Sequence, residues 1–262
     1  MLRFFSKLAA MFLFAGAAVA QTTPQAVGVV VMHGKGGSPT KFVAELASGL
    51  EAKGHLVANI EMPWSGNRNY DVDPAAAEAE VDAALDRLRV KGANRLFVAG
   101  HSQGGTFALY YGSKHAVDGI ISIAPGASTA SQVIREKLGG TLEEARKLVA
   151  AGKGGETARL QDFEGAKGTY VVVCKPDNYV SWFDPDGAMN LTKSIRAMRP
   201  GTPVLLVVPK NDYPGLLKAR QANFDALPRN PLTKLYEPDA THTGAPAASH
   251  EEISRWMMEV AR

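Results

Sequence analysis

Short apolar segments alternate with amphipathic segments along most of this chain, and the alternation predicts a mixed α/β protein. The apolar segments have the length of buried strands and are bounded by turn residues. The predicted strands are residues 26–32, 55–60, 95–100, 119–124, 203–208 and 233–236. Strands separated by helices favour a mostly parallel sheet of about six strands, with right-handed crossovers and helices on both faces.

Helices are expected where apolar residues recur every three or four positions. Ser38 followed by Pro39 predicts one helix start, with Phe42 on the buried stripe and Gly54 at the end. Asp73 and Pro74 predict a second start. Two Ser/Thr-x-x-Glu capping boxes, at residues 141–144 and 249–252, predict two more.

The alternation breaks over about residues 125–200, which predicts a cap inserted over the end of the sheet. A glycine-rich polar stretch occupies residues 152–168, and Tyr170–Cys174 has the pattern of a strand. Residues 179–185 are expected to form an aromatic loop before another helix. The insertion is expected to belong to one domain, which spans residues 21–262.

Composition narrows the class of partner and the compartment. The formal net charge is +3 and basic residues form no run, so nucleic acid is not an expected partner. Residues 1–20 combine a basic start, a short apolar core and an Ala18-Val19-Ala20 cleavage pattern. They predict a signal peptide and a periplasmic or secreted protein with no membrane span after cleavage. The lone Cys174 is expected to be a small buried residue.

One strand-to-helix junction carries the strongest chemical signal. Gly100-His101-Ser102-Gln103-Gly104 follows an apolar strand and precedes a helical segment. This spacing is typical of a nucleophile elbow, in which a sharp turn exposes the serine hydroxyl and glycines leave room for the turn. Ser102 is therefore the candidate nucleophile.

A serine needs a base, and the base needs a carboxylate to orient it. Asp212 and His242 follow the strands predicted at residues 203–208 and 233–236, and the carboxyl ends of parallel strands meet at one edge of a sheet. Asp184, Asp186 and Asp239 are alternatives for the acid, and His250 for the base. The order Ser102, Asp212, His242 favours those three.

Two further groups complete the predicted site. His33-Gly34-Lys35-Gly36-Gly37 follows the first strand, so the backbone N–H groups of Lys35 and Gln103 are candidates for an oxyanion hole. The aromatic side chains predicted to line the substrate pocket are Trp64, Tyr179, Trp182 and Phe183. Metal-ligand spacing is absent from the sequence, and we expect no metal and no cofactor.

With these motifs the chain resembles the α/β-hydrolase superfamily, and within it small exported bacterial hydrolases of esterase or lipase type. The resemblance rests on His33-Gly34, the Ser102 elbow, Asp212 and His242, and covers about residues 26–262 apart from the cap. It implies the α/β-hydrolase fold. The antiparallel strands that often open this fold are not predicted here.

The resemblance implies a serine hydrolase that cleaves carboxylic esters of small molecules through an acyl-enzyme. A peptidase, amidase or thioesterase with the same three residues is an alternative. A non-catalytic periplasmic binding protein that kept the fold is another, which intact Ser102, Asp212 and His242 argue against.

Overall fold

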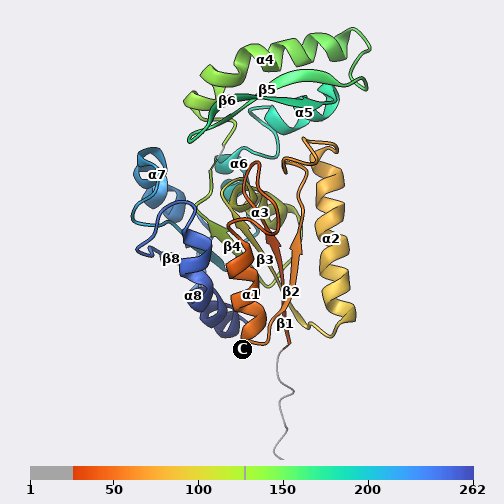
Figure 1. Ribbon diagram of the computed structural model, residues 1–262. Helices are drawn as coiled ribbons and strands as arrows, with labels where there is room; N and C mark the ends of the chain where they lie inside the picture. Colours follow the sequence, from red (N-terminus) through yellow and green to blue (C-terminus); the bar gives the residue numbers. More distant parts are fainter. Residues whose placement is uncertain (1–25, 127) are drawn as a thin grey trace, which may run out of the picture.

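A six-stranded parallel sheet forms the centre of the computed structural model, which describes residues 26–126 and 128–262 (Figure 1). The strand order is β2-β1-β3-β4-β7-β8. The strands are β1 (Val27–Met32), β2 (Leu56–Ile60), β3 (Arg95–His101), β4 (Gly119–Ile123), β7 (Val204–Val207) and β8 (Lys234–Tyr236). The predicted parallel sheet is thereby confirmed, whereas the predicted signal peptide lies outside the described residues.

Helices cover both faces of this sheet because its buried strands are apolar on both sides. Val29 and Val31 of β1 belong to one apolar cluster, which includes residues of α1 and α8. Val30 and Met32 belong to the other, with α2 and α3. The helices outside the segment between β4 and β7 are α1 (Ala44–Ala52), α2 (Pro74–Val90), α3 (Gln103–Lys114), α7 (Pro214–Asp225) and α8 (Ala245–Val260). No helix in the described ranges has both the length and the apolarity that a bilayer crossing requires.

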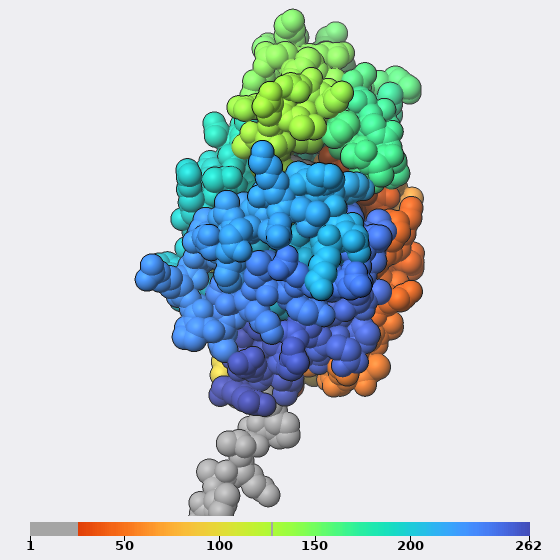
Figure 2. All heavy atoms as spheres, turned by 90° about the vertical axis from the view of Figure 1, so that its left-hand side faces the viewer, coloured from red at the N-terminus to blue at the C-terminus, as the bar shows by residue number. Residues whose placement is uncertain are grey.

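The segment between β4 and β7 contains a cap that lies over one end of the sheet (Figure 1). Its elements are α4 (Gln132–Ala150), β5 (Ala158–Glu164), β6 (Gly168–Cys174), α5 (Pro176–Phe183) and α6 (Leu191–Arg196). β5 and β6 form an antiparallel hairpin, and α6 returns to contact α3. In Figure 2 the green cap forms a layer above the blue C-terminal part of the protein.

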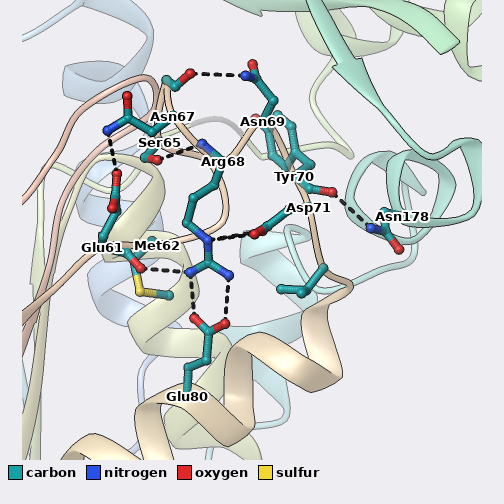
Figure 3. A network of polar contacts seen from close by, with 12 residues as sticks. Glu61, Met62, Ser65, Asn67, Arg68, Asn69, Tyr70, Asp71, Glu80 and Asn178 are labelled. Carbon is teal, nitrogen blue, oxygen red and sulfur yellow. Dashed lines mark hydrogen bonds and ion pairs between the residues drawn. The ribbon is translucent and has the colours of Figure 1, made fainter. Parts of the chain in front are cut away.

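The loop after β2, residues 61–73, connects the cap to the sheet. Arg68 holds this loop: its guanidinium donates two hydrogen bonds of 2.7 Å to Glu80 of α2 and others to Asp71 and the Glu61 carbonyl (Figure 3). From α5, Asn178 Nδ2 donates to the Tyr70 carbonyl at 3.0 Å. Trp182 Nε1 likewise donates to the Val72 carbonyl at 2.7 Å. The cap is therefore tied to a loop that is itself anchored.

Three predicted helix starts are wrong. α1 begins at Ala44 rather than Ser38, and Phe42 is in the left-handed region with φ 63° and 46% exposed instead of buried. Thr141 lies inside α4, which is capped by the Ser131 hydroxyl. Ser249 lies inside α8, which follows Gly244. A Ser/Thr-x-x-Glu sequence also occurs within continuous helices, because neither residue type interrupts the backbone hydrogen bonds of the helix.

The cap also differs from its prediction in two segments. Part of the stretch expected to be irregular forms β5, in which Leu160 and Asp162 are buried and Gln161 is exposed. An aspartate on the buried face hides the alternation on which a strand prediction depends. Residues up to Phe183 form α5 rather than a loop, because Pro176 occupies the first helical position and the aromatic residues share one buried face.

Candidate active site

The predicted nucleophile elbow is a tight turn between β3 and α3. Ser102 has φ 53° and ψ −114°, a backbone conformation that residues other than glycine rarely adopt. Its N–H donates to the Ile123 carbonyl at 2.8 Å, and its carbonyl accepts from Thr106 at 3.1 Å. A methyl group at Gly100 would lie 2.0 Å from the Gly104 carbonyl oxygen, so this turn requires glycine. The Ser102 side chain consequently projects beyond the end of the sheet.

The loops that carry Asp212 and His242 run side by side beyond β7 and β8. Lys210 N–H donates to the Pro238 carbonyl at 2.9 Å, and Asn211 N–H donates to the Ala240 carbonyl at 3.1 Å. Asn211 and Thr241 form a parallel bridge that continues the pairing of the two strands. The next residue along each loop, Asp212 and His242, is thereby brought to the same place.

The three predicted side chains form one chain of hydrogen bonds. His242 Nδ1 lies 2.7 Å from Asp212 Oδ1, and His242 Nε2 lies 3.0 Å from Ser102 Oγ. A carboxylate only accepts, so Nδ1 carries the proton and Nε2 is free to accept the Ser102 proton. The Asp212 side chain is fully buried, and its Oδ1 also accepts the Tyr213 N–H at 2.7 Å. This is the arrangement that activates a serine.

His101, for which the sequence predicts no catalytic role, lies directly behind His242. The two ring centroids are 5.0 Å apart, and His101 Nε2 lies 2.9 Å from the His242 carbonyl oxygen. Because the carbonyl accepts, Nε2 is the protonated nitrogen. Burial, with the nearby His242 ring as a smaller cause, lowers the pKa of His101 to about 3. A neutral His101 therefore holds the backbone of His242. Only its place next to Ser102 in the sequence pointed toward the site.

The loop after β1, residues 33–37, lies against the elbow. A methyl group at Gly34 would be 3.1 Å from Ser102 Cβ, and one at Gly104 would be 2.6 Å from the Met32 carbonyl oxygen. Gly36 N–H donates to the Trp64 carbonyl at 2.9 Å. Among the described residues the Lys35 N–H has no backbone acceptor. Gln103 is the first residue of α3, so its N–H has no intrahelical acceptor. Both N–H groups predicted for the oxyanion hole are thus available.

A cavity of about 670 Å³ opens beside Ser102 and His242. Its walls are mostly apolar and come from both the sheet end and the cap. Apolar lining residues include Phe42, Ile134, Phe163, Leu191, Tyr213 and Leu216. The volume falls in the range of small-molecule sites. The serine hydroxyl therefore meets a largely apolar space large enough for an organic substrate.

The aromatic residues predicted to line the pocket do not line this cavity, which corrects that expectation. All four are buried: Trp64 and Trp182 pack on Phe107 of α3, and Phe183 packs on Tyr70 and Tyr179. The Trp64 and Trp182 rings are 5.6 Å apart at 83°, and Tyr179 stacks on Phe183 at 4.3 Å. They form the apolar contact between cap and sheet. Their sequence pattern shows that they are buried but not which side they face.

The alternative site residues lie elsewhere. Asp239 is exposed and accepts from Asn211 Nδ2 at 3.1 Å. Asp184 and Asp186 belong to the cap, where the Asp184 carboxylate accepts the Asp186 N–H at 2.8 Å. His250 is inside α8, and its Nδ1 donates to the Ala247 carbonyl at 2.8 Å. None of the four lines the cavity beside Ser102.

Solved structures with a similar fold include lipases, esterases and other hydrolases. A monoacylglycerol lipase from Paleococcus ferrophilus is 18% identical, with a TM-score of 0.62 over 89% of this chain and 94% of its own. Est1E from Butyrivibrio proteoclasticus with bound ferulic acid is 17% identical, with a TM-score of 0.59 over 90% and 89%. A soluble variant of the Saccharomyces cerevisiae monoglyceride lipase, bound to a substrate analogue, is 17% identical with a TM-score of 0.59 over 90% and 87%.

These similarities identify the chain as a protein with the α/β-hydrolase fold. No protein-family model matches the sequence. A comparison with curated proteins gives no match either.

Proposed function

We propose that this protein is a serine hydrolase that cleaves carboxylic esters through an acyl-enzyme. The observation that carries the proposal is the continuous hydrogen-bond chain from Asp212 through His242 to Ser102, at the wall of an apolar cavity. A fold does not require these three side chains to meet. The hydrolases among the structural neighbours support the same reaction class.

In the first half of the reaction, Ser102 Oγ attacks the ester carbonyl carbon while His242 Nε2 takes the hydroxyl proton. Asp212 stabilises the resulting imidazolium through Nδ1–H. The carbonyl oxygen becomes an oxyanion, and the N–H groups of Lys35 and Gln103 donate to it. One such donor typically contributes about 3 kcal/mol to transition-state stabilisation. The bond to the alkoxy oxygen then breaks, and His242 protonates the departing alcohol.

In the second half, His242 accepts a proton from a water molecule as the water oxygen attacks the acyl carbon of the Ser102 ester. The second tetrahedral intermediate uses the same oxyanion donors. Its collapse breaks the bond to Ser102 Oγ and returns the proton from His242 to that oxygen. A carboxylic acid leaves, and the enzyme returns to its starting state.

Labelling with a fluorophosphonate, with the modified residue located by mass spectrometry, tests the proposal. We expect Ser102 to be labelled, and Ser102→Ala and His242→Ala to abolish labelling. His250→Ala is the matched control, because His250 lies inside α8, away from the hydrogen-bond chain, and should leave the labelling rate unchanged. A folded protein whose Ser102 is not labelled would contradict the proposal and favour the non-catalytic binding protein.

The class of bond is tested next, with p-nitrophenyl esters of increasing acyl length beside matched thioesters and anilides. The proposal expects the esters to have the highest kcat/KM. A higher kcat/KM for the thioester or anilide would leave the Ser102 mechanism intact and replace the ester assignment with the thioesterase or amidase alternative.

A further inference from the structure

A buried ion pair joins the cap to the loop after β1. Lys35 Nζ lies 2.5 Å from Asp162 Oδ1 and donates to the Phe163 carbonyl at 3.1 Å. The Lys35 side chain is 6% exposed and that of Asp162 is fully buried. Lys35 therefore has two separate features: it lines the cavity beside Ser102, and its side chain ends in the cap.

The Asp162 carboxylate is fully supplied with donors. Tyr70 Oη donates to Oδ2 at 2.7 Å and Tyr170 Oη at 3.1 Å, while the Phe163 N–H donates to Oδ1 at 2.6 Å. Burial and the adjacent Asp162 charge raise the pKa of the Tyr70 hydroxyl well above its usual range, so that it remains a donor. One carboxylate thus binds a residue from each of the two loops that follow β1 and β2.

Stability alone does not explain this arrangement. The desolvation cost of two buried charges is comparable to what their attraction returns, and a well-packed apolar pair is often at least as stable. A buried ion pair does impose one geometry, because the ammonium must stay within hydrogen-bond distance of the carboxylate. The effect of this ion pair is therefore to fix the position of the Lys35 side chain.

The backbone around Lys35 is fixed by the same two loops. Gly36 N–H donates to the Trp64 carbonyl at 2.9 Å, and Trp64 Nε1 donates to the His33 carbonyl at 2.8 Å. Trp64 and Tyr70 belong to the loop that Arg68 anchors (Figure 3). The Lys35 side chain hydrogen-bonds the cap hairpin directly, as Tyr70 does from the loop after β2. The backbone on both sides of Lys35 is thus held by hydrogen bonds to Trp64.

We propose that Asp162 is a positioning residue, which holds the loop of residues 33–37 in its oxyanion-binding conformation through Lys35 and Tyr70. This inference rests on the proposed function. It gives the cap hairpin a role in catalysis, because the hairpin carries Asp162. Asp162 does not touch the substrate. It acts by fixing where the Lys35 N–H lies when the oxyanion forms.

The main variant is Asp162→Asn, which keeps the shape of the side chain and removes its charge. Its matched control is Glu78→Gln. Glu78 is another buried carboxylate with three donors, Lys114 Nζ at 2.6 Å, Tyr110 Oη at 2.7 Å and His115 Nε2 at 2.7 Å, and it joins α2 to α3 away from the cavity. Both variants lose a buried charge, but of the two carboxylates only Asp162 is bound to Lys35.

Kinetics with a soluble p-nitrophenyl ester give the first measurement. We expect Asp162→Asn to lower kcat about 100-fold, the loss typical of one misplaced oxyanion donor, with KM changed less than threefold. A trifluoromethyl ketone, which forms a tetrahedral oxyanion on the serine, should lose affinity by the same factor as kcat/KM. Glu78→Gln should retain wild-type kcat. An unchanged kcat in Asp162→Asn would overturn the proposal.

Amide hydrogen exchange over residues 33–37 gives a second measurement that does not need activity. Exchange in this segment should accelerate in Asp162→Asn and remain unchanged in Glu78→Gln. If the wild-type protein hydrolyses nothing while Asp162→Asn still accelerates exchange, the proposed function fails and the positioning role stands. If the wild type is active and neither exchange nor kcat responds, the positioning role fails and the proposed function stands.

The double variant Lys35→Met with Asp162→Leu covers the case in which Asp162→Asn does not fold. It removes both charges together, so no unpaired ion is left in the interior. We expect it to fold and to show the same loss of kcat, because the link to the cap is gone. A folded double variant with wild-type kcat would overturn the proposal.

Discussion

Gly104→Ala tests the contact between the nucleophile elbow and the end of β1. The added methyl group would lie 2.6 Å from the Met32 carbonyl oxygen and 2.7 Å from the His33 carbonyl oxygen. These distances are about 0.8 Å shorter than an ordinary van der Waals contact. Both obstacles are backbone atoms, so a side-chain rotation cannot relieve them. The end of β1 and the loop that carries Lys35 must therefore move.

The expected cost follows from two opposing effects. Overpacking of a well-packed interior typically costs about 1–3 kcal/mol, whereas alanine favours a helix over glycine by about 1 kcal/mol. We expect Gly104→Ala to lower the free energy of unfolding by about 1 kcal/mol on balance. A shift of several tenths of an ångström at His33 also displaces the Lys35 N–H, and misplacement on this scale can lower a rate by about 10²-fold.

Gly139→Ala is the matched control, because Gly139 lies inside α4 and a methyl group there would meet nothing within 4 Å. The helix preference then acts alone, and the free energy of unfolding should rise by up to about 1 kcal/mol. Urea unfolding followed by circular dichroism measures both variants, and the rate of fluorophosphonate labelling measures the site. A Gly104→Ala protein as stable and as reactive as the wild type would refute the reasoning.

Three further results are expected. Below pH 6.5 His101 binds a proton in the unfolded chain, whereas in the folded protein it stays neutral down to about pH 3. Falling pH should therefore lower the free energy of unfolding by up to about 1.4 kcal/mol per pH unit from this residue. In His101→Gln the free energy of unfolding, measured with urea between about pH 4 and 7, should depend less on pH, and an equal pH dependence would contradict this. Asp212→Asn should lower kcat by about 10⁴-fold, because His242 would then adopt the wrong tautomer. Asp239→Asn changes an exposed side chain and should retain the wild-type kcat. Comparable losses of kcat in both variants would exclude Asp212 as the orienting acid. Burial, with the Asp162 charge as a smaller cause, raises the pKa of Cys174 to about 12, so iodoacetamide at pH 8 should modify the thiol only in urea, and rapid modification of the native protein would show that Cys174 is accessible.

The sequence predicts the sheet and the candidate catalytic groups because both depend on local patterns. β3 is apolar between Arg95 and His101, and Ser102, Asp212 and His242 each follow a strand whose carboxyl end reaches the same edge. Strand order and crossover handedness then leave few alternatives for where these residues lie.

The cap and its contacts depend on tertiary pairing, which no local pattern contains. Asp162 makes β5 look polar and irregular, since its partners Lys35 and Tyr70 are far away in the sequence. Trp64 and Trp182 are apolar wherever they face, so the sequence cannot distinguish a pocket wall from the packing between cap and sheet. Phe42 is exposed because the chain turns before α1 begins.

The cap leaves the sheet and returns to it between neighbouring strands, because β4 pairs directly with β7. Such an insertion can be exchanged during evolution without altering the register of the sheet, since loop length costs little in closure entropy. Lys35 restricts this freedom. A replacement cap that lacks a carboxylate at the position of Asp162 would leave the lysine ammonium buried without a counter-charge. Among related chains, residues 35 and 162 should therefore be inherited, and lost, as a pair.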